Sequence, residues 1–226
     1  VIAEIQARGR TPVVVGGTGL YFTALTEGLA EIPAVPTDVR AATAAEYEAM
    51  GEATFRARLA KQDPDAADRI SPGDQQRLAR AWEVFAATGV ALSDWQARTS
   101  PLLPESGWTG VVIDPPRDGL YARCDARLEA MVAAGALAEV EALMARDLAP
   151  ELPAMKAVGV RELAEHLAGR APLEAALAGA QRETRRYAKR QTTWARGRMQ
   201  GWARIDSLDP EDQWRQLLAL NPALTP

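Results

Sequence analysis

Residues that build disulfides and metal clusters are scarce in this sequence. Its 226 residues include one cysteine, Cys124, and one histidine, His166. A single cysteine forms no intrachain disulfide and anchors no zinc cluster, so a reducing, cytoplasmic setting is expected. His166 lies in the helix-type sequence ELAEHLAGR, where a surface histidine is the ordinary interpretation. No metal-ligating residue is predicted.

Long apolar runs are absent as well. Runs such as VVV and GVVI fall far short of the roughly 20 residues of a membrane-spanning helix, so no membrane partner is expected. No charged and then apolar leader precedes the fold, and the opening residues VIAEIQARGRTP start inside an amphipathic helix pattern. The sequence is therefore expected to be incomplete at its N-terminus.

Negative charge exceeds positive charge in the whole chain, but one segment is strongly basic. The formal net charge is −4, yet residues 181–204 contain eight Arg or Lys and one Glu, a local charge of +7 that leaves −11 for the remainder. Such a separation of sign is typical of a protein that binds nucleic acid.

Short apolar runs alternate with helix-type sequence, which predicts an α/β fold. Three runs have the pattern of buried parallel strands: Val13–Val15, Gly110–Ile113 and, less clearly, Arg204–Leu208. Between the first two lies a polar and helical stretch, roughly residues 37–100, flanked by the proline-containing segments EIPAVPTD and RTSPLLPESG. This stretch is predicted to be a helical insertion.

Two helices are predicted within the insertion. The first, TDVRAATAAEYEAMG, ends at Gly51. The second, SPGDQQRLARAWEVFAATG, has Ser71 as its N-cap, Pro72 at its first position and Gly89 at its exit. The second helix carries a buried stripe at i, i+4 and i+7 spacing, made of Leu78, Trp82 and Phe85.

A strand-to-helix turn near the start of the sequence is rich in glycine but lacks the lysine of nucleotide-binding loops. In VVVGGTGLYFTALTEGL, Gly16, Gly17 and Gly19 surround Thr18. A helix start offers free N–H groups to an anion, and small residues let a substrate approach the backbone. Because no Lys follows, this is not the G-x-x-x-x-G-K-[ST] loop. A tight connection of an ordinary α/β fold is the alternative interpretation.

The basic sequence RETRRYAKRQTTWARGR suits a helix with two different faces. A cationic stripe comprises Arg182, Arg185, Arg186, Lys189, Thr193 and Arg196. The neighbouring face carries Tyr187, Gln191 and Trp194. Cations spaced by one turn can follow a phosphate backbone, and aromatic rings can stack on unpaired bases. A solvated helix whose Tyr and Trp belong to the core explains the charge pattern as well.

Three further stretches carry weaker signals. DQQRL, Asp74–Leu78, places Gln and Arg at a helix start, where they can pair with base edges or simply cap the helix. KAVGVR, Lys156–Arg161, places two cations around a glycine turn. Arg123 and Arg127 lie one helical turn apart, a spacing that suits a diphosphate, although surface ion pairs explain it more often.

In their order along the chain, these motifs resemble one family. GRTPVVVGGTGLYFTALTEGL, DQQRLARAWEVFAATGVALSDWQ, LPAMKAVGVREL and TRRYAKRQTTWAR are similar to successive motifs of the tRNA dimethylallyltransferases. The resemblance runs from about Val1 to about Leu208. It implies a prenyltransferase that moves a dimethylallyl group from dimethylallyl diphosphate to N6 of the adenine just 3′ of the anticodon, with Mg²⁺ assistance.

The resemblance also implies an architecture. A P-loop-NTPase-like parallel sheet core, incomplete at its N-terminus, would comprise residues 1–36 and 108–226. An all-helical insertion domain, residues 37–107, would grip the anticodon stem-loop of the tRNA. The protein is expected to be a monomer.

The family's functional residues carry over to particular positions. Thr18 would lie in the reaction channel beside an adenine flipped out of the loop, and Arg123 and Arg127 would contact the diphosphate. Arg40 would touch the tRNA from the insertion. With Thr18, the remaining tRNA contacts implied by the resemblance are Asp74, Gln75, Gln76, Arg77 and Leu78; Lys156, Ala157, Val158, Gly159, Val160 and Arg161; and Lys189, Arg190, Gln191, Thr192, Thr193, Trp194, Ala195 and Arg196.

Two departures from the family pattern affect these expectations. The family's G-x-[ST]-x-[ST]-G-K-[ST] loop and the strand end that supplies its catalytic Asp are expected upstream of Val1, so the chain alone is expected to be inactive. Val160 stands where the family usually has Tyr, which removes a ring and a hydroxyl at that position.

Two alternative functions remain open. An adenylate isopentenyltransferase would prenylate a free nucleotide, and it would need neither the basic helix nor the insertion. A non-catalytic RNA-binding module would use both features without any chemistry.

Overall fold

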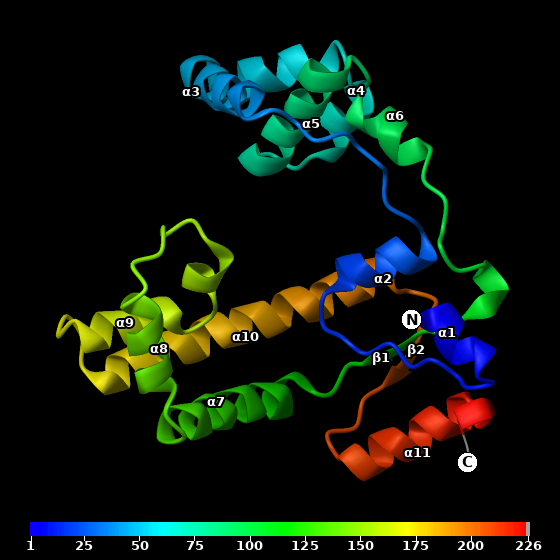
Figure 1. Cartoon of the computed structure of the whole chain (residues 1–226), viewed down its shortest axis with the longest axis vertical. Coiled ribbons are helices and arrows are strands. Elements are labelled where there is room, and N and C mark those ends of the chain that lie inside the picture. Colours follow the sequence, from blue (N-terminus) through cyan, green and yellow to red (C-terminus); the bar gives the residue numbers. More distant parts are fainter. Residues whose placement is uncertain (225–226) are drawn as a thin grey trace. The chain divides into compact units, whose positions relative to one another are not determined.

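The structure, a computed structural model, describes residues 1–224 and separates into two compact units. Unit 1 comprises residues 1–19 and the chain from Thr109 onward, and unit 2 comprises Leu20–Trp108. Figure 1 shows the elements of both. It stays a prediction that residues 1–36 and 108–226 form the catalytic core. It also stays a prediction that residues 37–107 form an insertion that grips the tRNA.

Unit 2 is helical, as predicted for the insertion. After α2 (Gly19–Thr26) its helices are α3 (Thr37–Ala60), α4 (Pro64–Arg69), α5 (Gln75–Thr88), α6 (Leu92–Ala97) and the 3-10 turn η1 (Glu105–Gly107). Its core joins α3, α4 and α5 around Phe55, Leu59, Ala66, Ala67, Ile70, Leu78, Ala81 and Trp82. The predicted stripe is confirmed, because Leu78 and Trp82 are buried and Phe85 packs against them.

The ends of these helices follow glycine conformation and capping. Gly51 has φ +72° and kinks α3 where the first helix was predicted to end, and Gly89, also left-handed, closes α5. The predicted start at Ser71 is wrong. Gly73 has φ +83°, which keeps Pro72 outside the helix, and the carboxylate of Asp74 caps α5 by accepting the Arg77 N–H at 3.1 Å.

Within unit 2, the segment at the end of α2 runs beside the segment that follows α6. The N–H of Leu103 donates to the carbonyl of Leu25 at 2.9 Å. A Cβ on Gly28, whose φ is +92°, would collide with the backbone of Ser100. Only glycine therefore fits this crossing, where the chain leaves α2 and later returns.

Unit 1 combines a two-stranded parallel sheet with long helices. Its elements are α1 (Ile2–Ala7), β1 (Val111–Ile113), α7 (Arg117–Ala133), α8 (Ala136–Met144), η2 (Pro153–Lys156), α9 (Val160–Leu167), α10 (Leu173–Arg198), β2 (Ala203–Ile205), α11 (Pro210–Leu220) and η3 (Pro222–Leu224). β1 pairs with β2 in the register Val111↔Ala203. The predicted α/β class with a parallel sheet is confirmed.

One predicted strand is absent from the described residues, and another is displaced. Val13–Val15 forms no strand and has no pairing partner within residues 1–224, and its side chains are exposed, Val15 by 88%. A strand needs a neighbouring strand for its backbone hydrogen bonds, so an apolar run alone does not make one. The predicted Arg204–Leu208 strand pairs only as Ala203–Ile205. The chain then turns toward α11, where the Ser207 hydroxyl accepts the N–H of Asp209, the N-cap of α11.

Helices α7 to α10 form the larger part of unit 1. Figure 1 shows α7 lying along α10; α9 packs on α10, and α8 packs on α9. The buried cluster at this end comprises Ala136, Val140, Leu163 and Ala176. In the described part of the chain, no helix is both long and apolar enough to cross a lipid bilayer.

Candidate nucleic-acid interface

Helix α10 is the scaffold of the predicted basic surface. Its 26 residues span about 39 Å. Small residues face the interior of unit 1, among them Ala180, Ala188 and Ala195. Lys189, Arg190 and Thr193 are exposed on other sides of the same helix. The basic segment is helical as predicted, but its buried face is made of these small residues and not of Tyr187, Gln191 and Trp194.

The glycine turn packs directly on α10, although the two segments are 174 residues apart in the sequence. The side-chain Nε2 of Gln191 donates to the carbonyl of Gly17 at 2.8 Å. A Cβ on Gly17 would overlap the Gln191 amide, and one on Gly19 would fall on the indole ring of Trp194. Glycine is thus required by contact with α10, and Thr18 is left exposed between the two contacts.

Four cations of α10 form no ion pair with any residue in 1–224. The paired cations are Arg185 with Asp125 (2.6 Å), Arg186 with Glu183 (2.6 Å) and Arg196 with Asp114 (3.2 Å). Those without an ion pair are Arg182, Lys189, Arg190 and Arg198. An unpaired, solvated cation is free to neutralise a phosphate, so these four carry the positive charge available to a ligand.

Asp114 organises the charges at the end of β1. Its carboxylate, whose side chain is only 12% exposed, accepts hydrogen bonds from Arg196 at 3.2 Å and from Arg204, on β2, at 3.1 Å. Its own N–H donates to the carbonyl of Ile205, which extends the sheet by one bond. Arg196 nevertheless stays 61% exposed, so Asp114 fixes the position of this guanidinium without removing it from solvent.

Tyr187 and Trp194 have different surroundings on the same face of α10. Trp194 is half-buried beneath Gly19. Tyr187 is 43% exposed, and the guanidinium carbon of Arg190 lies 5.6 Å from the centre of its ring. The core interpretation therefore applies to Trp194, while the Tyr187 ring remains open to a ligand.

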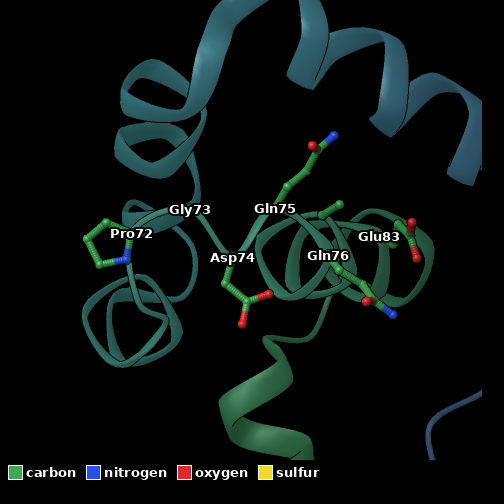
Figure 2. Close-up of a pocket in the computed structure, with 7 residues that line it drawn as sticks. Pro72, Gly73, Asp74, Gln75, Gln76 and Glu83 are labelled. Atoms are coloured by element: carbon green, nitrogen blue, oxygen red, sulfur yellow. The ribbon is translucent and has the colours of Figure 1, made fainter. Parts of the chain in front are cut away.

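In unit 2, the DQQRL segment borders an open hollow of about 750 Å³, lined by Pro72, Gly73, Asp74, Gln75, Gln76, Ala79 and Glu83. Figure 2 shows the amide side chains of Gln75 and Gln76 pointing in different directions from the first turn of α5. Arg77 is exposed as well, whereas Leu78 is fully buried. The side chain of Leu78 belongs to the core and cannot reach a ligand in this structure.

An ion pair on α3 holds the loop that leads to DQQRL. Arg56 donates to the carbonyls of Ala67 and Ile70, both at 2.6 Å. Glu52 accepts from Arg56 at 2.8 Å and from the N–H of Gly73 at 3.0 Å. These hydrogen bonds, the one from Arg56 first, lower the pKa of Glu52 below its usual value. The first turn of α5 is thereby fixed in place.

The KAVGVR segment forms the turn between η2 and α9. Gly159 has φ +94°, which confirms the predicted glycine turn, and it is buried. Lys156 and Arg161 are exposed on either side of the turn, and Arg161 pairs with the adjacent Glu162 at 2.9 Å. Val160 packs against the cluster formed by α8 and α9, which explains an aliphatic side chain at this position.

Among the remaining predicted site residues, Arg40, Arg123 and Arg127 are exposed. Arg40 lies in the first turns of α3. Arg123 and Arg127 project from α7, and neither pairs with a carboxylate within residues 1–224. The side of α7 that meets α10 instead carries Asp125 and Glu129, which bond to Arg185 and Gln181.

Comparison with known proteins identifies the family. The family model described as IPP transferase matches residues 1–198. The tRNA dimethylallyltransferase of Phenylobacterium zucineum is 66% identical over 226 residues, which are 100% of this chain and 73% of the relative. The chain belongs to the IPP transferase family. The resemblance read from its four motifs is confirmed.

Solved structures agree with this membership. The full-length tRNA isopentenylpyrophosphate transferase of Bacillus halodurans is 29% identical with a TM-score of 0.59, over 98% of this chain and 70% of that one. A eukaryotic dimethylallyltransferase acting on tRNA is 23% identical with a TM-score of 0.76, over 98% of this chain and 58% of that one, and supports the fold alone. The P-loop-NTPase-like fold expected of an IPP transferase is thus supported.

The structure of this IPP transferase chain brings some predicted residues together and adds others. Thr18, Gln191 and Trp194 meet at one place. Asp114 was missed, although a carboxylate directly after a parallel strand is a usual site position. The pair formed by Glu52 and Arg56 was missed too, and its i, i+4 spacing was the available signal. In residues 1–224, no three His, Cys, Asp or Glu side chains gather as a metal site.

Proposed function

We propose that this chain provides the tRNA-binding and adenine-binding part of a tRNA dimethylallyltransferase. The observation that carries the proposal is the joint between the glycine turn and α10, where Gln191 bonds to Gly17 and Trp194 supports Gly19. This joint places the small, exposed turn beside the unpaired cations of a nucleic-acid-binding helix. Membership of the IPP transferase family supports the same function.

The proposed reaction places the chemistry at Thr18. The N6 amine of an adenine attacks C1 of dimethylallyl diphosphate, so that an N–C bond forms while the C–O bond to the diphosphate breaks. Diphosphate leaves with the electron pair, and the alkylated amine gives its proton to a general base or to solvent. An adenine stacked within a loop cannot reach the allylic carbon, so it must be flipped out. Gly17 and Gly19 hold the turn against α10, which leaves Thr18 exposed, and its hydroxyl can accept a hydrogen bond from the adenine amine.

Charge on α10 and α7 supports two kinds of phosphate contact. The unpaired α10 cations Arg182, Lys189, Arg190 and Arg198 are proposed to follow the backbone of the anticodon stem-loop, with Arg196 held beside it by Asp114. Arg123 and Arg127 are proposed to face the diphosphate. Mg²⁺ would accompany the diphosphate, since this cation is usually held by one or two carboxylates together with substrate phosphates.

Unit 2 and the KAVGVR turn are proposed to complete the grip on the tRNA. Gln75, Gln76 and Arg77 stand exposed on a loop that Glu52 and Arg56 hold in place, and such side chains pair with base edges. The other contacts carried over from the family are Arg40, Asp74, Lys156, Ala157, Val158, Val160, Arg161, Thr192 and Thr193. Gly159 and Ala195 are buried, so they are proposed as supporting backbone only. A cytoplasmic monomer remains the expected state.

The test exchanges the matching segment of the Phenylobacterium zucineum relative for this chain and assays prenyl transfer. The substrates are radiolabelled dimethylallyl diphosphate with either an anticodon stem-loop or free AMP. The proposal predicts label in the stem-loop and none in AMP. Label in AMP alone would establish the adenylate isopentenyltransferase, and stem-loop binding without transfer would establish the RNA-binding module. The unexchanged relative is the positive control.

A further inference from the structure

The two aromatic residues of the α10 site differ in what covers them, and only one is available to a ligand. Trp194 lies under the glycine turn, where a Cβ on Gly19 would enter its ring. Its face is occupied by protein, so it cannot stack on a base without displacing the turn. Tyr187, two turns earlier on the same face, is 43% exposed.

Tyr187 stands between the glycine turn and the cations. Gln191 bonds to Gly17 and lies one turn further along α10, so Tyr187 is one helical turn, about 6 Å in rise, from the residue that holds the glycine turn. The guanidinium of Arg190 lies 5.6 Å from the ring centre, and Lys189 is exposed on the adjoining stripe. Arg190 thus lies over one face of a ring that is 43% exposed, and an aromatic ring flanked by cations is the arrangement that binds single-stranded nucleic acid.

We infer that Tyr187 is the residue on which an unpaired base of the anticodon loop stacks, while Trp194 only supports the glycine turn. This inference rests on the proposed function, since it takes the ligand of α10 to be RNA. A base stacked on Tyr187 would be fixed at the edge of the turn that carries Thr18. Arg190 and Lys189 would then bind the phosphate of that nucleotide, since their charges have no carboxylate partner among residues 1–224.

The experiment measures binding of the chain to an anticodon stem-loop by fluorescence anisotropy. Tyr187→Ala is expected to raise the dissociation constant about 5- to 150-fold, the range of one base–aromatic stack. Tyr187→Phe keeps the ring and should bind like the parent. Trp214→Ala, which removes a 50% exposed aromatic from α11, is the matched control and should have no effect. Circular dichroism checks that each variant folds.

A second arm identifies the base and separates stacking from other roles. Stem-loops with one abasic residue, placed at each loop position in turn, are titrated with the parent and with Tyr187→Ala. At one position the two proteins should bind equally, because the stacking partner is gone. Equal binding of parent and Tyr187→Ala to the intact loop overturns the inference. So does a Tyr187→Phe variant as weak as Tyr187→Ala, or a penalty that persists at every abasic position.

A separate variant distinguishes failure of this inference from failure of the proposed function. Lys189→Ala removes an unpaired cation and should weaken stem-loop binding, with a smaller salt dependence. If Lys189→Ala weakens binding and Tyr187→Ala does not, RNA binding by α10 stands and stacking on Tyr187 is wrong. If the parent does not bind the stem-loop, both the proposed function and this inference fail.

Discussion

Removal of two unpaired cations from α10 should reduce the salt dependence of tRNA binding by a definite amount. Lys189 and Arg190 are two of the four α10 cations that have no ion pair within residues 1–224. Each phosphate neutralised on single-stranded RNA contributes about −0.7 to the slope of log K against log salt, so four contacts give about −2.8. The parent should then lose about 50-fold in affinity between 50 and 200 mM salt, roughly 4 to the power 2.8.

The double variant Lys189→Ala/Arg190→Ala should retain a slope of about −1.4, which corresponds to a loss of about 7-fold over the same range. The assay is fluorescence anisotropy with a labelled anticodon stem-loop at several salt concentrations. Arg170→Ala/Arg215→Ala is the control, because it changes the net charge equally but removes cations already paired with Glu165 and Asp212. Equal slopes for parent and double variant, or an equal reduction in the control, would refute the assignment of the RNA surface to α10.

Three further predictions concern the packing beneath the site. Gly19→Ala should destabilise the protein by about 1–3 kcal/mol in urea unfolding, because its Cβ would meet the Trp194 ring of α10. Gly197→Ala, within α10, has open space around its Cβ and should be neutral or stabilising. Leu78→Ala should cost about 2–5 kcal/mol by the same measurement, as a fully buried core residue; a loss of RNA affinity without a loss of stability would contradict its assignment to the core. Burial raises the pKa of Asp63, but hydrogen bonds from Ser93 and from the N–H of Ala66 outweigh it and leave the pKa lowered. The carboxylate therefore stabilises the fold above its unfolded pKa, near 3.8, and this stability is lost as the pH falls below about 4, so Asp63→Asn should unfold with a smaller dependence on pH between about 5 and 2.

The helical parts of the fold could be predicted because their signals are local. The stripe of Leu78, Trp82 and Phe85, the kink at Gly51 and the exit at Gly89 follow from spacing and from glycine conformation. The start of α5 could not be located from the sequence, since Ser71 and Asp74 are both good caps. The left-handed conformation of Gly73, between them, determines that the helix begins after Asp74. The prediction of a strand at Val13–Val15 was wrong for another reason. Strand formation depends on a neighbouring strand in space, which the local sequence does not reveal.

The candidate site was predictable in its residues but not in their contacts. Sequence patterns indicated the glycine turn and the basic helix separately. Nothing in either pattern shows that Gln191 bonds to Gly17 across 174 positions, or that Trp194 rather than Tyr187 supports the turn. Asp114 was missed because its partners, Arg196 and Arg204, reach it from distant segments through parallel pairing of β1 with β2.

Prenyl transfer by the exchanged Phenylobacterium relative is the most direct test of the central claim. The account predicts N6-dimethylallyladenosine in the stem-loop when this chain replaces the matching segment. The same exchange with Lys189→Ala/Arg190→Ala should require a higher stem-loop concentration for half-maximal rate, with little change in the maximal rate. Dimethylallyl transfer to AMP alone, or a double variant with an unchanged half-saturating concentration at 200 mM salt, would contradict the account.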